Sequence, residues 1–581
     1  METSQEQDQQ SEASQIEIKG SSPNQTSPKT LNFATFEPGS TSAVHLLEAV
    51  KTAASPDRYL SQCLISDDEH ILYLLSIHPV TGDGAASALT RKVTWRIGAG
   101  PTPQLREKLG EKGVPCCEVD LLICPPGRSA GSKVARESIG STHAMLQIHA
   151  TSGSLLLRST CRKPIIYLRG HPDGRHLTLR GGQSCLLFHQ DNHLCFGDYE
   201  FVLSFSLDSP EDRHNFRLQR NNLLLDSYGS WPSQHLDVVP SPSHKICSDV
   251  SIHRTLSQDS GRRTFSGIRL YTGEPVLLRQ IHCNTGTQRC VQNELHVTAM
   301  FDAAACSGVI GMLGQAWCQH GASPPCQIEN EAPAEDVYYV TQLVEYNFSS
   351  MPWPKPRSRM DSRLNRFHET LKGLGELHDK GLIHGQLRPE SLVLVLAQEN
   401  PQEGNLNRNL PPLSHNFSLS PMTAAISDLG WAKASPFCDD KPDIRGVWVA
   451  PEVWTSSAEA PFTNKADIWG LAMSWLSTYV YVPTDVNITR ANFKMIQDGI
   501  NVIFKKGHVT KPFCNLLLSM LAWDSDDRPS IQGILAHEVW RDLQKEKGSK
   551  QEMARAEGEN ILQDLGPNAK KVRVLSPEVE E

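Results

Sequence analysis

The sequence predicts a multidomain protein in which an all-β domain precedes a domain of strands followed by long helices. Length is the first observation behind this prediction, because 581 residues exceed one ordinary domain and suffice for two separate cores. The second is a change in the spacing of apolar residues. Alternation with period two recurs over residues 44–208, and a spacing of three or four residues dominates later in the chain.

Composition argues against several functional classes. Apolar residues make up 39% and charged residues 21%, as in a globular protein with some unstructured polar sequence. A net charge of -9 makes nucleic acid an unfavourable partner, and none of the 15 cysteines forms a C-x-x-C pair that would indicate a zinc ribbon. No secretory signal or long apolar run is visible, so we expect no membrane segment and a location in cytoplasm or nucleus, with reduced thiols.

The patterns divide the chain into five segments. Residues 1–40 are rich in Gln, Ser, Glu and Thr and are expected to be disordered, because they bury too little apolar surface to offset chain entropy. Residues 41–215 hold alternating stretches separated by turn-forming residues, which indicates a β-sandwich or a barrel. Residues 216–249 contain a Ser/Pro-rich connector and are expected to be a linker. Residues 250–542 form the second domain, and residues 543–581 are a charged tail.

Two helices in the second domain can be predicted from apolar spacing. The first ends near Gly381 and carries apolar residues three or four positions apart on one face, namely Leu364, Phe367, Leu371, Leu374 and Leu377. The second, residues 466–476, is apolar nearly all round, so we expect it to be buried on every side.

Short motifs in residues 250–542 follow one another in a specific order. The longest, residues 384–391, reads H-G-Q-L-R-P-E-S and comes directly after the predicted amphipathic helix. The others are V-L-L-R at 276–279, N-E at 293–294, D-L-G at 428–430, A-P-E at 450–452, D-I-W at 467–469 and D-R-P at 527–529. Together these motifs resemble those of the protein kinase family. The resemblance implies a two-lobed α+β fold, with ATP and Mg²⁺ as the cofactors of an active member.

The resemblance also implies roles for single residues. Arg279 stands where protein kinases have the lysine that orients ATP, and Glu294 is its partner. Thr341 occupies the gatekeeper position, and the following hinge, up to Val344, offers backbone groups to adenine. Asp428 is the implied metal ligand.

Three further residues have implied structural roles. Glu452 of the A-P-E motif and Arg528 of the D-R-P motif form an ion pair in the family. Asp467 begins the buried helix, where an aspartate is a favourable cap.

The catalytic motifs depart from the family pattern. Gln386 replaces the aspartate that accepts the proton of the substrate hydroxyl, and an amide cannot take up a proton at neutral pH. Ser391 replaces the asparagine that binds the second magnesium, and a neutral hydroxyl is a poorer ligand for that ion. Arg279 carries a planar guanidinium group, which is wider than the compact ammonium group of lysine. The phosphate-covering loop, residues 256–265, has Gly261 as its only glycine.

These departures predict an inactive kinase homologue that binds and regulates. The alternative is an active Ser/Thr kinase with an atypical site, in which Asp428 holds magnesium and Arg388 contacts the γ-phosphate. This alternative stays open because phosphoryl transfer depends mostly on positioning and charge stabilisation. A third possibility is that nucleotide binds without transfer and acts as a switch ligand.

The first domain resembles a second family. The segments W-R-I-G at 95–98, T-H-A at 142–144 and C-F-G-D at 195–198 are similar to segments of forkhead-associated domains, which read phosphothreonine and precede the kinase in checkpoint-type Ser/Thr kinases. The resemblance implies an interaction domain of a signalling protein, with phosphothreonine-containing proteins as partners.

The residues implied to bind phosphate have also changed. Ala99 stands where the phosphate-binding arginine is expected, and Gly140 stands where a serine is expected, with Ser141 beside it. Arg158, Arg162 and Lys163 are the candidate replacement donors, since phosphate recognition favours charge-assisted hydrogen bonds. The alternative is that these side chains are solvated charges at strand ends. We expect the nearby His143 to be a packed scaffold residue.

Overall fold

The computed structural model describes most of both predicted domains. The described residues are 31–53, 64–66, 71–77, 93–100, 119–125, 130–228, 231–241, 243–259, 261–284, 286–301, 308–318, 335–353, 363–396, 422–432, 446–455, 463–484 and 486–541. The predicted disorder of residues 1–30 and the predicted charged tail, residues 543–581, lie outside them.

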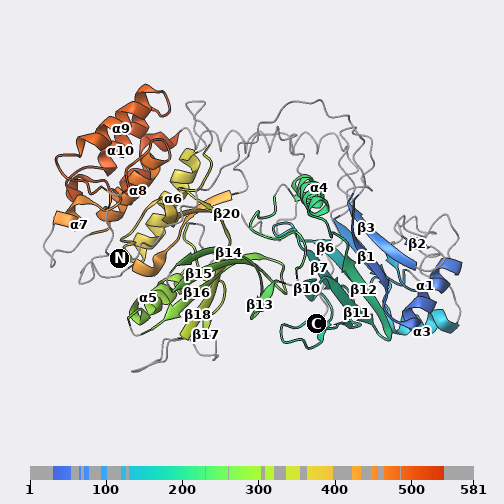
Figure 1. The fold of residues 1–581 in the computed structure, drawn as a ribbon. Helices are drawn as coiled ribbons and strands as arrows, with labels where there is room; N and C mark the ends of the chain where they lie inside the picture. Colours follow the sequence, from blue (N-terminus) through green and yellow to red (C-terminus); the bar gives the residue numbers. More distant parts are fainter. Residues whose placement is uncertain are drawn as a thin grey trace, which may run out of the picture.

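The first domain is a sandwich of two β-sheets, as expected (Figure 1). One sheet has the strand order β2-β3-β1-β12-β11-β8-β9 and the other has the order β10-β7-β6-β4-β5. The elements are β1 (Leu31–Pro38), α1 (Thr41–Ala53), β2 (Leu64–Ser66), β3 (Ile71–Ile77), β4 (Thr94–Gly98), β5 (Leu121–Leu122), α3 (Ala130–Ser138), β6 (Ala144–Ile148), β7 (Leu155–Ser159), β8 (Ile165–Tyr167), β9 (Leu177–Leu179), β10 (Ser184–Leu186), β11 (Asp191–Phe196) and β12 (Tyr199–Phe205).

Alternating burial explains why these residues form half-buried strands. In β6 the side chains of Ala144, Leu146 and Ile148 are buried, whereas those between them are only partly covered. Phe33 of β1 packs against Trp95 of β4 in the other sheet, with ring centroids 5.5 Å apart. The apolar sides of the two sheets therefore face each other and form one core.

The sandwich begins earlier than the composition predicts. β1 lies within residues 1–40, which were expected to be disordered, yet it pairs with both β3 and β12. Phe33, Ala34 and Phe36 of this strand are buried, whereas Thr35 is only partly covered. The next residues, Thr41–Ala53, form a helix rather than strands, because the spacing of Ala43, Leu47 and Val50 matches one helix face.

The expected linker is partly folded. Helix α4 (Pro210–Tyr228) crosses the predicted boundary at residue 216 and lies beside the sandwich (Figure 1). Phe216, Leu223 and Leu224 of this helix are buried in the same core as the sandwich strands. The Ser/Pro-containing connector thus begins only after α4.

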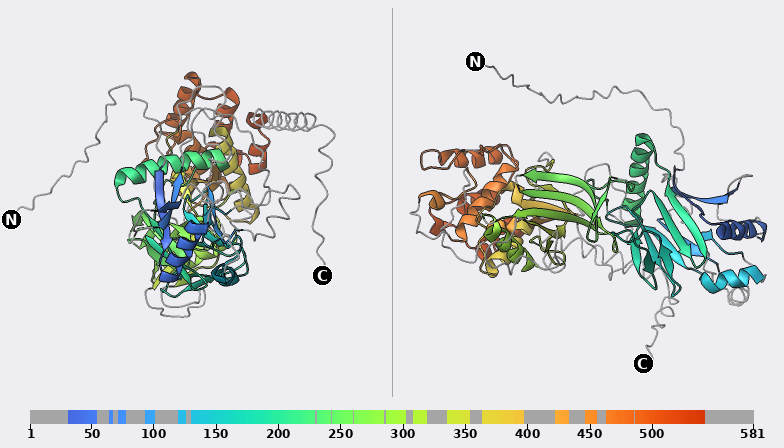
Figure 2. Two further views of the ribbon diagram at one scale, coloured as in Figure 1. Left: turned by 90° about the vertical axis from the view of Figure 1, so that its right-hand side faces the viewer. Right: turned by 60° about the horizontal axis from the view of Figure 1, so that its bottom comes forward.

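The second domain has the two lobes that the motifs imply. Its first lobe is a six-stranded sheet with the order β13-β14-β15-β16-β18-β17 and one helix, α5. Its elements are β13 (Lys245–Cys247), β14 (Val250–Asp259), β15 (Arg262–Arg269), β16 (Pro275–Cys283), α5 (Gln288–Ala299), β17 (Trp317–Cys318) and β18 (Glu335–Gln342). Figure 2 shows this strand-rich lobe between the sandwich and the helical lobe.

The second lobe is mainly helical, with a three-stranded sheet in the order β19-β20-β21. Its elements are β19 (Val344–Asn347), α6 (Arg363–Asp379), η2 (Pro389–Ser391), β20 (Leu392–Leu396), β21 (Met422–Ile426), η3 (Leu429–Trp431), α7 (Pro451–Thr455), α8 (Lys465–Ser477), α9 (Lys494–Lys505), α10 (Lys511–Met520), η4 (Ser525–Asp527), α11 (Ile531–Leu535) and η5 (Glu538–Trp540).

Both predicted helices are confirmed. Phe367, Leu371 and Leu374 of α6 are buried, and the chain turns after this helix at Gly381, whose φ is 72°. α8 is buried from Ala466 to Leu476.

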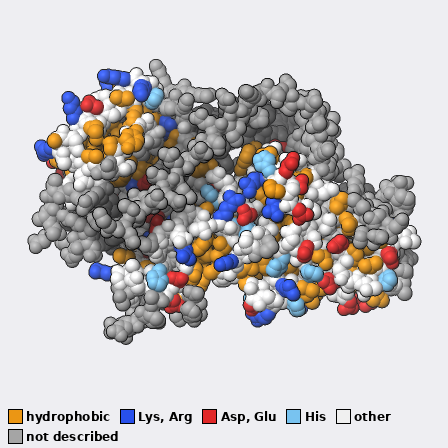
Figure 3. All heavy atoms as spheres, viewed as in Figure 1, with side chains coloured by type: hydrophobic (Ala, Val, Ile, Leu, Met, Phe, Trp, Pro, Cys, Tyr) orange, Lys and Arg blue, Asp and Glu red, His pale blue; other side chains and the backbone are white. Residues whose placement is uncertain are grey.

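The helical lobe also leaves apolar side chains at its surface. Figure 3 shows hydrophobic side chains gathered over α9 and α10, and the exposed ones on these two helices are Met495, Val502, Phe504 and Leu518. Among the described residues, no helix has the length and apolarity needed to cross a membrane.

Candidate functional site

The α5 glutamate has more partners than the sequence predicts. Glu294 is 1% exposed and lies 3.9 Å from the guanidinium of Arg279, its expected partner. Arg262 at the tip of the β14–β15 hairpin lies closer, with 3.0 Å between Nη2 and Glu294 Oε2. The hydroxyl of Tyr339 in β18 donates a further hydrogen bond to Glu294. No local motif marks Arg262 or Tyr339, because their roles depend on strands that meet only in the folded sheet.

Arg279 also reaches the expected metal ligand. Its Nη1 lies 3.4 Å from Asp428 Oδ1, and its side chain is 17% exposed. Burial by itself lowers the pKa of Arg279, but the neighbouring Tyr339, Asp428 and Glu294 outweigh burial and hold that pKa above its ordinary value. The guanidinium is therefore a fixed positive charge between two carboxylates.

The D-L-G segment is held in place from both lobes. Asp428 has a left-handed backbone conformation, with φ of 61°, and its side chain is 41% exposed. Leu429 is buried in the helical lobe, and Asn293 of α5 donates to the carbonyl oxygens of Gly430 and Ala432 at 3.1 and 2.9 Å. A Cβ at Gly430 would lie 2.8 Å from Glu294 Oε2, so this close approach requires glycine.

Asp467 supports the H-G-Q-L loop instead of capping its own helix. α8 begins at Lys465, and the Asp467 carboxylate accepts hydrogen bonds from the amides of His384 and Gly385 at 2.8 and 2.9 Å. His378 Nε2 lies 2.9 Å from the same carboxylate. The interpretation of Asp467 as a helix cap is therefore wrong, because the carboxylate satisfies loop amides from a neighbouring element.

Gln386 occupies the position expected for the missing base. Its backbone amide nitrogen donates to His384 Nδ1 at 3.3 Å, and its backbone carbonyl oxygen accepts from the hydroxyl of Ser391, also at 3.3 Å. Within the described ranges, no carboxylate hydrogen-bonds to the Gln386 side chain. The Ser391 hydroxyl is buried and bonded within the loop. Arg388 is 45% exposed and lies 3.9 Å from Glu390.

Thr341 and Val344 lie where the chain passes from one lobe to the other. Thr341 is 1% exposed and pairs with Leu277 of β16, whereas Val344 begins β19 and is partly buried. Leu343 between them is 4% exposed. The chain thus passes from the strand-rich lobe to the helical lobe at residues 342–344, as expected for a hinge.

Three phosphate-site candidates of the sandwich are exposed. Ser141 precedes β6, Arg158 lies on β7 opposite Met145, and Arg162 follows β7. The Thr160 hydroxyl donates to the carbonyl of Thr142 at 2.9 Å, so the loops that carry Ser141 and Arg162 are neighbours. These two residues therefore lie at the same end of the sandwich.

His143 and Lys163 near this end serve the scaffold. His143 is fully buried, its Nδ1 accepts from the Gly140 amide at 3.1 Å, and its Nε2 lies 3.1 Å from the Lys163 carbonyl. Burial lowers the pKa of His143 to about 4, which keeps the ring neutral. The Lys163 ammonium donates to the carbonyl of Arg136 at 2.5 Å.

Comparison with known proteins gives three similar Ser/Thr kinases. The chain is 24% identical over 204 residues to the DNA damage response protein kinase DUN1 of Saccharomyces cerevisiae, covering 34% of this chain and 38% of that protein. It is 28% identical over 192 residues to the ovarian-specific serine/threonine-protein kinase Lok of Drosophila melanogaster, covering 31% and 35%. It is 26% identical over 175 residues to the serine/threonine-protein kinase MST20 of Pyricularia oryzae, covering 29% and 16%. Each match thus spans less than two fifths of the relative.

No family model matches the sequence. Among solved structures, the crystal structure of Rad53 1-466 in complex with AMP-PNP matches with a TM-score of 0.38 and 14% identity, covering 76% of this chain and 90% of that chain. The motif order, the two-lobed fold that carries it and the sequence similarity to DUN1, Lok and MST20 make the second domain similar to Ser/Thr protein kinases, and a β-sandwich precedes this domain.

Proposed function

We propose that this chain is an intracellular signalling protein whose kinase-like domain binds and regulates partners instead of phosphorylating them. The observation that carries the proposal is the amide of Gln386 at the position of the catalytic base. General-base help of this kind contributes about 10²–10⁴ in rate. Among the described residues, no carboxylate hydrogen-bonds to this side chain.

The phosphate end of the cleft supports the same proposal. Arg262 ties the β14–β15 hairpin to Glu294, although in the family this hairpin covers the phosphates. Glu294 then shares its charge between Arg262 and Arg279. A hairpin held against α5 in this way leaves less room for a triphosphate beneath it.

The residues present fit magnesium poorly. Mg²⁺ prefers octahedral oxygen ligands with one or two carboxylates. Asp428 is the one expected carboxylate, and it is paired with Arg279. The Ser391 hydroxyl is buried and bonded to Gln386. Bound ATP would contact the hinge and Arg279, whereas the metal would depend on Asp428.

An assay of phosphate transfer tests the proposal. The purified full-length chain is incubated with ATP radiolabelled on its γ-phosphate, with Mg²⁺ or Mn²⁺ and a mixture of Ser/Thr peptides. The Asp428→Asn variant serves as the matched control. We expect equal incorporation by the two proteins. Incorporation that depends on Asp428 would overturn the proposal.

An active Ser/Thr kinase with an atypical site is the second candidate. The exposed carboxylate of Asp428 favours it, since the side chain remains accessible to a metal ion beside the buried Leu429. Loss of the base alone slows phosphoryl transfer but does not forbid it. The same assay decides between the two candidates.

For the sandwich we propose binding of phosphothreonine-containing proteins. Ser141 and Arg162 lie on neighbouring loops and supply a hydroxyl and a guanidinium, which are donors suited to a phosphate. Titration of the full-length chain with a phosphothreonine-peptide library tests this. We expect the chain to bind phosphothreonine peptides but not their unphosphorylated forms. The Arg162→Ala variant should bind the phosphorylated peptides more weakly. Equal binding of phosphorylated and unphosphorylated peptides would contradict it.

A further inference from the structure

One side of the strand-rich lobe faces the nucleotide cleft. Strand pairing places Leu277 of β16 directly opposite Ser266 of β15 and Thr341 of β18. Arg279 lies two residues after Leu277 and therefore points to the same side of the sheet, where it reaches Asp428. Ser266 and Leu277 thus belong to the roof of the cleft, next to the hinge.

The interdomain linker contacts this roof. Ser266 is fully buried, and its hydroxyl donates to the carbonyl oxygen of His235 at 2.7 Å. The His235 ring in turn donates from Nε2 to the carbonyl oxygen of Glu345 in β19 at 2.9 Å. One linker residue therefore bridges the roof strand and the chain directly after the hinge.

The linker also fills apolar space there. Leu236 is 2% exposed and belongs to the same hydrophobic cluster as Leu277 of the roof and Leu343 of the hinge. Val344 packs against this cluster as well. Val238 and Val239, further along the linker, line a pocket with sandwich residues such as Leu187 and Phe205, so the contact with the roof and the hinge is made by His235 and Leu236.

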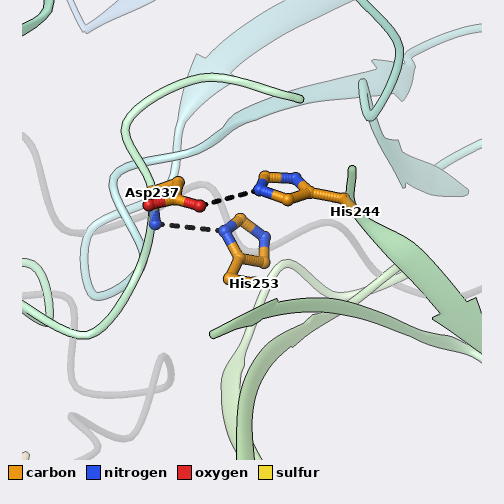
Figure 4. A group of neighbouring side chains, drawn as sticks. All are labelled: Asp237, His244 and His253. Atoms are coloured by element: carbon orange, nitrogen blue, oxygen red, sulfur yellow. Dashed lines mark hydrogen bonds and ion pairs between the residues drawn. The ribbon is translucent and has the colours of Figure 1, made fainter. Parts of the chain in front are cut away.

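A polar cluster anchors the linker after Leu236. Arg254 of β14 donates to Asp237 Oδ1 from Nε and Nη2, at 2.9 and 2.7 Å, and His244 Nε2 lies 2.8 Å from Asp237 Oδ2. The Asp237 amide donates to His253 Nδ1 at 3.1 Å (Figure 4). The two bonds from Arg254 are charge-assisted, and such bonds are stronger than those between neutral groups.

An aspartate and two histidines, as in Asp237, His244 and His253, are residue types that can bind a metal ion. Here their hydrogen bonds hold the linker in place instead, and we call these three residues the latch. Nδ1 of His253 accepts the Asp237 amide, and Nδ1 of His244 accepts the Ser241 amide at 3.3 Å. In a neutral ring the proton then lies on Nε2, so the lone pairs needed for a metal are already used. The Arg254 guanidinium is paired with the same carboxylate, and its positive charge would repel a metal cation.

We propose that the linker occupies the adenine end of the cleft with His235 and Leu236, so that residues 233–239 must leave before a nucleotide can enter. This inference deepens the proposed function, because it rests on the kinase-like cleft and names the chain's own linker as the regulator of that cleft. It does not require the domain to be inactive. The phosphate end is held by Arg262 and Glu294, and the adenine end is held by His235 and Leu236.

Binding of adenosine to the full-length chain tests the inference. Adenosine has no phosphates, so its affinity reports the adenine end alone. We expect Leu236→Ala and, separately, Asp237→Ala to bind adenosine at least about tenfold more tightly than wild type, because an occluded state lowers the apparent affinity by the fraction of open molecules. Leu224→Ala is the matched control, since Leu224 is buried in α4 within the same core but is not part of the linker run.

Hydrogen exchange provides the second readout. Saturating adenosine should raise deuterium uptake in residues 233–239 of the wild type, and circular dichroism checks that each variant is folded. Equal adenosine affinity in wild type and both linker variants, including no detectable binding in any of them, would overturn the inference. So would adenosine binding that leaves uptake in residues 233–239 unchanged.

The two proposals fail separately. Linker variants that gain adenosine binding without phosphate transfer support both. A gain of transfer in these variants would refute the proposed function and support the linker inference. Unchanged adenosine binding would refute the linker inference and leave the proposed function as it stands.

Discussion

Single side chains change what the cleft can bind. Gln386 removes the proton acceptor, and Arg262 competes with Arg279 for Glu294. The first change affects the transfer step, whereas the second affects the space and charge beneath the hairpin. Restoring one of them should therefore not restore an active site.

The Gln386→Asp variant tests this separation. We expect it to incorporate no more radiolabelled γ-phosphate than the Gln386→Asp/Asp428→Asn double variant, because Arg262 still holds Glu294 and Asp428 is still paired with Arg279. A gain of about 10²–10⁴, the usual contribution of a general base, would show that the base alone was missing.

The Glu452–Arg528 ion pair makes a stability prediction. The pair is confirmed, with oxygen–nitrogen distances of 2.6 and 2.8 Å, and the Arg528 side chain is 0% exposed. Glu452→Ala leaves a buried unpaired guanidinium, so we expect a loss of about 3–5 kcal/mol in the free energy of unfolding. Asp524→Ala, at the exposed pair with Arg490, should cost about 0–1 kcal/mol. Urea unfolding measures both, and similar losses would contradict the prediction.

At the scale of elements, the linker behaves as part of the fold. α4 completes the sandwich core, and the residues after it bond to the roof strand and to β19. Asp237, His244 and His253 form the latch of the linker. Burial and the nearby His244 lower the pKa of the His253 ring to about 3. The groups that face it are Asp237, His244 and Arg254, with Arg217 of α4 close to Asp237 and Arg254.

Linker docking should therefore weaken in mild acid. A released His253 takes up a proton below pH 6.5, its ordinary pKa, whereas the docked ring does not until about 3. The contribution of the docked neutral ring is fully present above pH 6.5 and is lost as the pH falls from there towards 3. Asp237 has a lowered pKa, because bonds from His244 and Arg254 outweigh burial, so its contribution is lost only below 3.8.

Hydrogen exchange of residues 233–239 between pH 7 and pH 5 checks this expectation, after correction for intrinsic rates. Uptake should rise towards pH 5 in the wild type. His253→Asn keeps an acceptor but cannot titrate, so its corrected uptake should be flat over the same range. A flat wild-type profile would contradict the prediction.

At the scale of the whole molecule, part of the strand-rich lobe packs into the sandwich core, while other residues of this lobe form separate clusters. Ile268, Leu270 and Leu277 belong to the same cluster as the sandwich residues. The Leu186 amide of β10 donates to the Leu270 carbonyl at 2.6 Å, and the Ser184 hydroxyl donates to the Tyr271 carbonyl at 2.6 Å. The helical lobe has a separate core.

Shared packing predicts shared stability. Leu270→Ala creates a cavity in this core, so we expect a loss of about 2–5 kcal/mol that appears in hydrogen exchange of both β7 and β16. Leu517→Ala, in the core of the helical lobe, should leave exchange in β7 unchanged. Confinement of the Leu270→Ala effect to β16 would show that the two domains are independent.

Periodicity and motifs were enough to predict the architecture. The alternation that ends in β12, the apolar face of α6 and the all-round apolarity of α8 are local patterns, and each produced the expected element. The boundary at residue 41 was placed too late, because the few apolar residues of β1 are outweighed by the polar residues around them. The helix α4 was missed because its few apolar residues face one core while the rest are polar.

The sequence by itself determined which side chains are missing from the catalytic motifs, since that information lies in residue identity at ordered positions. Only the tertiary structure decided which other side chains contact the residues that line the cleft. Arg262 meets Glu294, and His235 meets Glu345, across long stretches of chain. Such pairings depend on how strands and lobes come together, and no local pattern of apolar or charged residues specifies them.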